Sequence, residues 1–382
     1  MALFFANWAA LLLSLFVAGC LIGALFAKPV QKVLVATARK LLGIELTRAL
    51  VNPVMRPSHN LWEAEAVFNP GALVLANRTH LIYRAIGADG ESRLGYASSP
   101  DGLLFDERLP YPMYVLNTPR MVGGTRRYNP VLFPSGGSWG GYEDPRMVAI
   151  EDRVYVTFNM FENWTLRAGY LVIDEKDFLA KRFYKWEGPY VLSHGNRDKY
   201  WVLFPEKMGG KFAVLHSILG ETDDRVRIEY VEDLRTLKER RFPSPDPQQH
   251  PDKLIAWHMH MRSAGPPPLK TEKGWLVFYH AHDAAEPHKY KVGAMLLDLK
   301  DPTRILCRSV APVLEPTYPY ENAGKPGIVY ASGATIYNGN IHLYYGGADK
   351  VICVATAPLH TFLNALTKGK NTVLSANPLR VS

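Results

Sequence analysis

The chain has 382 residues, of which 47% are hydrophobic and 12% aromatic, so it can build one large domain or two ordinary ones. Its net charge of +8 favours an anionic partner, and the absence of an arginine-rich tract, zinc-finger spacing or RNA-binding signature argues against nucleic acid. Three cysteines allow one bridge at most, which excludes a disulfide-built scaffold and favours buried free thiols.

The N-terminal segment is the first predicted element. Residues 2–27 carry no charge, and an apolar run of about 20 residues is enough to cross a bilayer. The run lacks the basic start and the cleavage site of a secretory signal, so we expect an uncleaved single-pass transmembrane helix. Four basic residues follow within 28–40, and the positive-inside rule then places the rest of the chain in the cytosol. Sequons at Asn77 and Asn163 leave a lumenal orientation, or a cleaved signal, open.

Residues 28–60 form a predicted basic juxtamembrane segment. Apolar residues recur at helical spacing from 30 to 51, which predicts a helix. This helix could lie on anionic headgroups through its basic residues, or it could pack on the next domain as a linker. We therefore expect an anchor over 1–27, this segment, and one main domain over 61–382.

The main domain is predicted to consist of short strands. Alternating apolar runs are bounded by Gly, Pro, Asn or Asp, and few helical stretches interrupt them, so we expect an all-β sandwich, barrel or propeller. About five four-stranded blades of about 60 residues would use this length, which favours a propeller. The predicted strand runs lie within 71–87, 153–161, 168–174, 211–219, 227–234, 274–282, 291–299, 333–348 (a hairpin with Asn338-Gly339 at its turn) and 351–357.

The stretch Gly140–Asn159, GGYEDPRMVAIEDRVYVTFN, places two acids and an arginine around a proline, just before an alternating apolar run. We predict a glycine-rich turn that carries Glu143, Asp144 and Arg146, followed by a strand. Taken alone, the stretch is also explained by two acids that cap a turn and an arginine that pairs with them. In a propeller, however, polar residues at strand ends line the axial pocket, so these residues are candidates for a site.

Seven stretches between Asn69 and Asp349 together resemble the β-mannoside phosphorylase family, glycoside hydrolase family 130, and its relatives that act as β-1,2-mannosyltransferases. In order, they read NPGALVLANRTHLIYRAIG, LGYASSPDGLLFD, YEDPRM, WVLFPEKMGGKFAVLH, GPPPLKTEKGWLVFYHAH, GAMLLDLKDPTRIL and YYGGAD. The resemblance implies a five-bladed β-propeller with its sugar site in the central depression, here behind an N-terminal transmembrane helix. It implies no cofactor and no metal. His258 and His260 alternate onto one strand face, but no third ligand at suitable spacing accompanies them.

The resemblance implies inverting mannosyl transfer with Asp144 as the acid. Asp144 would protonate the departing glycosidic oxygen, relayed through a sugar hydroxyl, while phosphate attacks the anomeric carbon from the opposite face. Phosphate is itself a nucleophile, so a phosphorylase needs cations where an inverting hydrolase needs a second carboxylate. In the reverse direction Asp144 becomes the base, and mannose 1-phosphate is the donor.

The resemblance also implies a sugar site around this acid. Asp349 matches the aspartate that holds the sugar in the cleaving subsite, where a carboxylate can accept bonds from two vicinal hydroxyls. Asn69 and Arg84 match positions that line the same subsite. Arg146 would hold Asp144 in place or bind the sugar. Taken singly, Asp349 also fits an ordinary turn after two glycines.

The anion site departs from the family pattern. Phosphorylases commonly read LHRP after the LFPEK strand, and this arginine helps to bind phosphate, whereas the present chain reads LHSI. Ser217 therefore stands in place of the arginine, and the pocket could take phosphate, a sugar phosphate or a larger sugar nucleotide. The residues that we assign to phosphate are Lys199, Lys207 and Arg262, and those that we assign to the substrate beside them are His216 and His280.

Three functions stay open. The first is a membrane-anchored phosphorylase or mannosyltransferase that acts on manno-oligosaccharides, with mannose 1-phosphate or GDP-mannose as donor; the Asp-x-Asp motif of metal-dependent transferases is absent. The second is a hydrolase with Glu206 or Glu321 as the base that activates water. The third is a non-catalytic carbohydrate-binding propeller, against which the joint presence of Asp144, Asp349 and Arg84 argues.

Overall fold

The protein is described here by a computed structural model that covers residues 44–115, 127–162, 165–193, 201–217, 226–239, 260–282, 286–309 and 311–368. Contacts group the chain from Glu45 onward into one compact unit. The described residues of this unit are mostly strands, and their α-helices are α2 (Glu175–Leu179) and α3 (Leu359–Lys368). Short 3-10 turns are η1 (Leu61–Glu63), η2 (Phe183–Lys185), η3 (Leu234–Glu239) and η5 (Pro319–Glu321).

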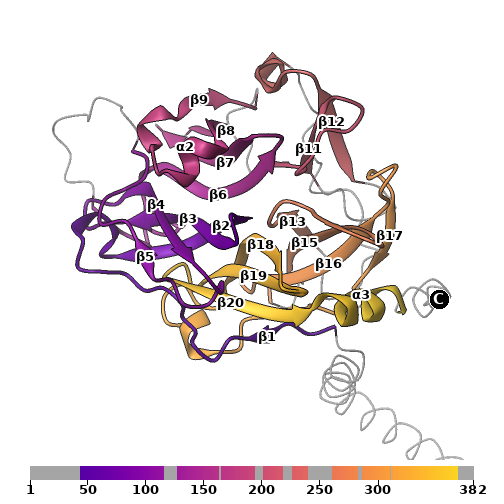
Figure 1. The fold of residues 1–382 in the computed structure, drawn as a ribbon. Coiled ribbons are helices and arrows are strands. Elements are labelled where there is room, and N and C mark those ends of the chain that lie inside the picture. Colours follow the sequence, from indigo (N-terminus) through magenta and orange to yellow (C-terminus); the bar gives the residue numbers. More distant parts are fainter. Residues whose placement is uncertain are drawn as a thin grey trace, which may run out of the picture. The chain divides into compact units, whose positions relative to one another are not determined.

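The strands of the described residues form four sheets (Figure 1). The largest sheet contains β2 (Ala66–Leu75), β3 (Arg78–Ile86), β4 (Glu91–Ser99), β5 (Glu107–Arg108), β6 (Gly140–Ile150), β7 (Arg153–Glu162), β8 (Thr165–Asp174) and β9 (Glu187–Val191). A second sheet contains β10 (Val202–Leu203), β11 (Phe212–Ser217) and β12 (Arg227–Val231). A third contains β13 (His260–Ala264), β14 (Leu269–Thr271), β15 (Gly274–His282), β16 (Lys291–Leu297) and β17 (Ile305–Arg308). The fourth contains β1 (Thr47–Arg48), β20 (Val351–Pro358), β19 (Asn340–Gly347) and β18 (Val329–Tyr337).

The predicted five-bladed propeller is not what the described strands form. They are all-β in character, but they assemble into four sheets because β4 and β6 pair in parallel through Ser92 and Gly141 and join two groups of strands. Gly141 has a φ of +108°, and a Cβ atom on it would lie 2.1 Å from the Ser92 carbonyl oxygen. Only glycine permits this approach, and the sequence pattern did not reveal it.

The predicted single-pass membrane protein is not supported by the described residues. Among the described residues the longest helix, α3, has ten residues, and none of their helices is long and apolar enough to cross a membrane, which takes about 20 residues. The apolar segment 2–27, on which the prediction of an anchor and a cytosolic orientation depended, lies outside the described residues.

The helix predicted over residues 30–51 is wrong at its C-terminal end. Thr47 and Arg48 form strand β1, which pairs antiparallel with β20. The Arg48 guanidinium also binds the buried carboxylate of Glu321, with Nε 2.6 Å from Oε1. A sheet edge and a buried ion pair therefore override the local helical spacing.

Local sequence signals are confirmed where a turn is decided within a few residues. The hairpin of β18 and β19 turns at Asn338 and Gly339, with φ of +48° and +74°, as a two-residue hairpin turn requires. Cys307 and Cys353 are buried free thiols, as expected.

Bulges mark the strands that lead to the centre of the unit. The register shifts once in each of β2, β6, β11, β13 and β18, between Phe68 and Gly71, Glu143 and Arg146, Leu215 and Ser217, Met261 and Ser263, and Ala331 and Gly333. A bulge leaves a residue unpaired and re-aims its side chain. Because β2 packs against both β6 and β18, polar side chains from these strands can meet (Figure 1).

Candidate active site

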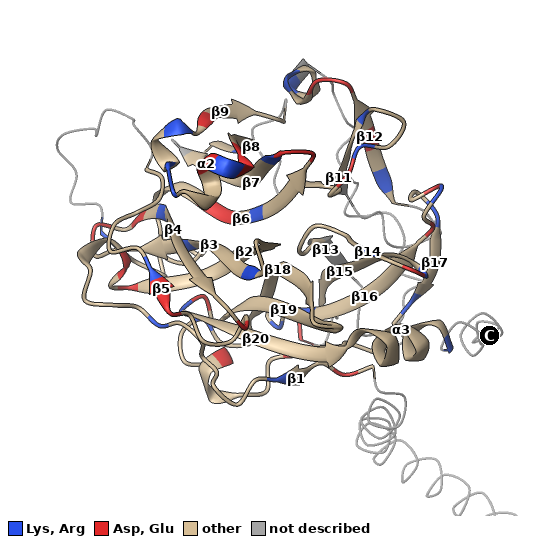
Figure 2. Cartoon of the chain, viewed as in Figure 1, with Lys and Arg blue, Asp and Glu red and all other residues tan. Residues whose placement is uncertain are grey.

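Asp144 lies at the bulge within strand β6. The sequence had suggested a turn before a strand, and this prediction is wrong. Its φ is +52°, a left-handed conformation that aspartate tolerates better than most residues, and Pro145 follows it at a position where a strand can accept proline. The side chain is 94% buried. Figure 2 shows acidic and basic bands close together on β6, between strands that are otherwise largely uncharged.

Asn69 repeats this arrangement in β2. It has a φ of +47° at a bulge, Pro70 follows it, and its Nδ2 donates to Oδ1 of Asp144 at 2.7 Å. A Cβ atom on Gly71 would lie 2.9 Å from the Pro145 carbonyl oxygen, so this glycine allows β2 to approach β6. The two Pro-containing bulges therefore bring the amide and the acid into direct contact.

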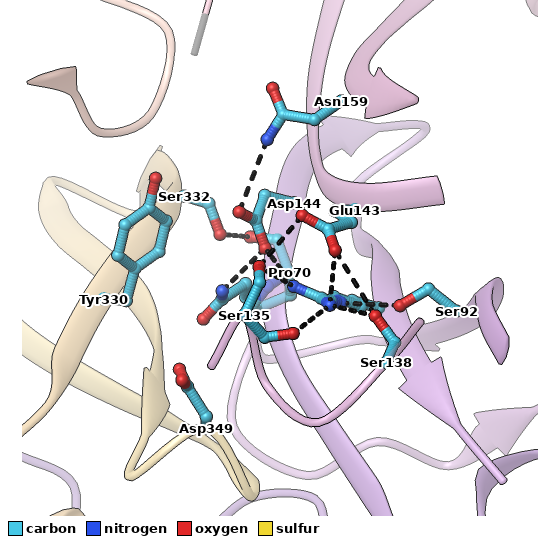
Figure 3. A network of polar contacts seen from close by, with 12 residues as sticks. Pro70, Ser92, Ser135, Ser138, Glu143, Asp144, Asn159, Tyr330, Ser332 and Asp349 are labelled. Atoms are coloured by element: carbon cyan, nitrogen blue, oxygen red, sulfur yellow. Dashed lines mark hydrogen bonds and ion pairs between the residues drawn. The ribbon is translucent and has the colours of Figure 1, made fainter. Parts of the chain in front are cut away.

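The second oxygen of Asp144 faces Asn159 of β7, which donates from Nδ2 to Oδ2 at 3.4 Å (Figure 3). Asn159 was missed in the sequence analysis. A signal existed, because β7 follows β6 through a tight turn after Ile150, which pairs with Arg153. Counting back along a regular hairpin from that pair places Asn159 opposite Asp144.

Arg84 and Glu143 form a buried ion pair beneath the acid. Nη2 of Arg84 lies 2.8 Å from Oε1 of Glu143, and Nη1 lies 3.4 Å from Oδ1 of Asp144. Burial opposes the positive charge of Arg84, but Glu143 and Asp144 outweigh it and raise the arginine pKa above its ordinary value. Arg84 therefore stays cationic next to Asp144.

Three serines complete this buried pair. Arg84 donates through Nε to Ser92 Oγ at 2.8 Å, and through Nη2 to Ser138 Oγ and the Ser135 carbonyl oxygen, both at 2.7 Å. Ser135 and Ser138 also donate to the Glu143 carboxylate, at 3.0 and 3.3 Å. Glu143 is thus held as a structural partner of Arg84, and the sequence did not predict the serines.

Arg146 reaches from β6 towards β13 and β18. Its Nε donates to the Gly265 carbonyl oxygen at 2.6 Å, Nη1 to the Asp144 carbonyl oxygen at 2.9 Å, and Nη2 to the Tyr330 hydroxyl at 3.1 Å. Arg146 is 99% buried. It therefore fixes the backbone at Asp144 and places a second positive charge in the site.

His280 supports Tyr330 from β15. The rings stack at 4.1 Å with an interplanar angle of 14°, and His280 Nε2 accepts a hydrogen bond from the Ala331 N–H at 2.9 Å. Burial, and then the charge of Arg146, lowers the pKa of His280 to about 3. The imidazole is therefore neutral at physiological pH, and Tyr330 is a site residue that the sequence analysis missed.

Asp349 approaches the site from the turn after β19. Its φ is +53°, and its side chain is 14% exposed. Burial, assisted by Asp144 and Glu143, raises its pKa to about 6, against the opposing charges of Lys325 and Arg84. Figure 3 shows Asp349 and Tyr330 on the opposite side of the site from Glu143 and Asn159.

Only part of the predicted phosphate site lies within the described residues. Lys207 lies apart from this group, with its Nζ 3.0 Å from the Glu151 carboxylate and 5.0 Å from the centre of the Phe212 ring. Lys199 lies outside the described residues, as do the side chains of His216 and Arg262, whose backbones belong to β11 and β13. Their assignments stay predictions.

Both carboxylates considered as hydrolytic bases are engaged elsewhere. Glu206 pairs with Lys270 at 2.6 Å, and both side chains are partly exposed. Glu321 is fully buried and accepts bonds from Arg48 and from the Tyr345 hydroxyl at 2.8 Å. Within the described ranges, no three His, Cys, Asp or Glu side chains gather into a group that could hold a metal ion.

Comparison with known proteins identifies the family of the chain. Residues 52–368 match the family model of glycoside hydrolase family 130, described as beta-1,4-mannooligosaccharide phosphorylase. The chain is 34% identical over 323 residues to a 1,2-β-oligomannan phosphorylase from Thermoanaerobacter sp. (strain X514), covering 82% of this chain and 97% of the relative. It is 31% identical over 326 residues to a β-1,2-mannobiose phosphorylase from the same strain, covering 81% and 96%.

A solved structure shares the fold. The β-1,2-mannobiose phosphorylase from Listeria innocua, in complex with β-1,2-mannobiose, superposes with a TM-score of 0.60 at 23% identity, over 84% of this chain and 99% of that chain. The all-β fold is that of a carbohydrate-active enzyme family. The chain belongs to glycoside hydrolase family 130, the family of mannoside phosphorylases, which confirms the resemblance stated from the sequence.

Proposed function

We propose that the protein is an inverting phosphorylase of short β-1,2-linked manno-oligosaccharides. The observation that carries this proposal is the environment of Asp144. It is a buried carboxylate oriented by the amides of Asn69 and Asn159, next to the cations Arg84 and Arg146. The linkage is suggested by the relatives, two of which are phosphorylases of β-1,2-mannans or β-1,2-mannobiose.

In the proposed reaction, protonated Asp144 delivers its proton to the glycosidic oxygen as the bond between this oxygen and the anomeric carbon breaks. A phosphate oxygen forms the new bond from the opposite face, so the configuration inverts and the products are α-mannose 1-phosphate and an oligosaccharide shortened by one mannose. Asp349 would accept hydrogen bonds from sugar hydroxyls. Arg146 would offset the charge of the phosphate, together with Lys199 and Arg262 as predicted from the sequence.

Phosphorolysis fits the described carboxylates better than hydrolysis. An inverting hydrolase needs a second carboxylate that activates water across the sugar ring. Glu143 is held by Arg84 and two serines, and Glu206 and Glu321 have partners of their own. A reaction in which the nucleophile arrives as an anion avoids the need for this base.

Synthesis of an oligosaccharide requires a mannosyl donor. We infer that synthesis, when it occurs, uses mannose 1-phosphate, because this is the reverse of the cleavage step and uses the same acid as a base. The replacement of the family arginine by Ser217 is the feature that favours the alternative, a pocket that takes GDP-mannose.

The test is an incubation of the protein with β-1,2-mannobiose, with and without phosphate, followed by NMR of the products. Two further arms contain mannobiose with mannose 1-phosphate or with GDP-mannose. We expect α-mannose 1-phosphate and mannose only when phosphate is present. Release of mannose without phosphate would identify a hydrolase. Elongation of mannobiose from GDP-mannose but not from mannose 1-phosphate would identify a nucleotide-dependent transferase. Binding of mannobiose without turnover in any arm would leave a carbohydrate-binding protein.

A further inference from the structure

Residues 127–139, which we call the serine loop, carry Ser135 and Ser138 to the Arg84–Glu143 pair. The loop has internal hydrogen bonds, such as Gly137 N–H to the Phe133 carbonyl oxygen at 2.8 Å. Its N-terminal side is attached through the Tyr128 N–H, which donates to the Ala88 carbonyl oxygen at 3.1 Å. The loop tip is exposed, with Val131 at 88% relative exposure. Its C-terminal side is attached through the Trp139 N–H, which donates to the Gly90 carbonyl oxygen at 3.0 Å, so the contacts made near Ser135 hold the stretch between these two attachments.

Lys325 makes such a contact from another part of the chain. Its Nζ donates to the Pro134 carbonyl oxygen at 2.8 Å, and the same atom lies 3.8 Å from Oδ2 of Asp349. The Lys325 backbone N–H donates to the Ala348 carbonyl oxygen at 2.8 Å. One ammonium group thus contacts both the serine loop and the carboxylate proposed to hold the sugar.

The backbone next to Lys325 fits this position closely. A Cβ atom on Gly324 would lie 2.4 Å from the Ala348 carbonyl oxygen, so the segment before the lysine lies directly on the turn that carries Asp349. Because the Lys325 side chain is 44% exposed, its substitution should not disturb the core. The charged groups that act on Asp349 are Lys325, Arg84, Asp144 and Glu143.

We propose that Lys325 is a positioning residue for sugar binding, which ties the serine loop to the Asp349 turn and holds the Asp349 carboxylate towards the sugar hydroxyls. This inference rests on the proposed function. Because Lys325 has no contact with Asp144, its loss should weaken sugar binding more than it slows the chemical step.

Lys325→Met tests the proposal, since methionine keeps much of the side-chain length without the charge. We expect the KM for β-1,2-mannobiose to rise about tenfold, the size expected when a hydrogen bond to a charged donor is lost, with kcat within about twofold of wild type. Lys325→Arg should recover most of the affinity. The matched control is Lys270→Met, another half-exposed lysine paired with a carboxylate, which should leave both constants unchanged.

Two further readouts separate this role from a general loss of structure. Amide hydrogen exchange in residues 129–138 should become faster in Lys325→Met without substrate, and unchanged exchange would overturn the tie to the serine loop. Removal of the positive charge should also move the acidic limb of kcat/KM to higher pH, because Asp349 then loses its proton less readily. A lower kcat at unchanged KM would overturn the positioning role. An inactive wild type would refute the proposed function, while the exchange measurement would still decide the tie.

Discussion

The Asn69 side chain donates to the carboxylate of Asp144 across 2.7 Å, although 75 positions separate the two residues in the chain. Both have left-handed backbone conformations, with φ of +47° and +52°, and a proline follows each of them. In both strands, a bulge followed by proline thus orients a short polar side chain towards the other strand. The contact fixes one oxygen of Asp144, and the other oxygen faces Asn159, so the acid has a defined orientation before substrate arrives.

Asp144→Asn should abolish phosphorolysis of mannobiose, with a loss of about 10² or more in kcat, because the amide cannot donate a proton to the leaving oxygen. Aryl β-mannosides with an acidic phenol need little protonation, so the same variant should lose much less activity on them. Steady-state kinetics with both substrates checks this. Asp152→Asn, at the exposed end of the same hairpin, is the control. Equal losses on both substrates would show that Asp144 is not the acid.

Asn69→Gly should lower kcat about 10- to 100-fold, because Asp144 loses the amide that orients it. Glycine is the informative choice, since it accepts the left-handed φ that alanine would strain. Asn77→Gly is a matched control, as Asn77 also has a positive φ of +57° but lies in an exposed turn. A wild-type kcat for Asn69→Gly would remove the positioning role of the amide.

Asp349→Asn should stabilise the protein at neutral pH while it abolishes sugar binding. The pKa of Asp349 is raised from 3.8 to about 6 in the folded protein, so the folded state binds more protons between these values and stability falls as pH rises through this window. The ionised group therefore costs about 3 kcal/mol at pH 7 and close to nothing at pH 3 and below.

Chemical denaturation at both pH values measures this difference. The variant should be more stable than wild type at pH 7 and indistinguishable from it at pH 3. A wild type that is the more stable protein at pH 7 would show that Asp349 gains more from its cationic neighbours than burial costs it.

Ser217→Arg should lower the KM for phosphate about three- to tenfold, the effect of one added charge-assisted hydrogen bond, if this position belongs to the anion site. Ser217→Met adds comparable bulk without charge and should not do so. Phosphate-dependence curves for the two variants and wild type check the prediction. The same KM in all three would place the anion site elsewhere.

The sequence predicted the elements that are decided locally. The Asn338-Gly339 turn, the strand runs on either side of it and the buried thiols follow from backbone preferences and hydrophobic alternation over a few residues. Local helical spacing failed at Thr47 and Arg48, because their strand partners Thr356 and Ala355 lie about 300 positions away and the Glu321 carboxylate lies 273 positions from Arg48. The spacing contained no information on that partner.

Short motifs in a fixed order were enough to predict the family, the strand-rich character and Asp144 as the acid to examine. The division of the strands into sheets, and the place of Asn159 beside Asn69 and Arg84 at that acid, emerged only from the folded chain. The reason is steric: Gly141 against Ser92, and Gly71 against Pro145, allow backbones to approach where any Cβ atom would collide. Such approaches join segments distant in the chain, and they bring β2 and β4 against β6, the strand that carries Asp144.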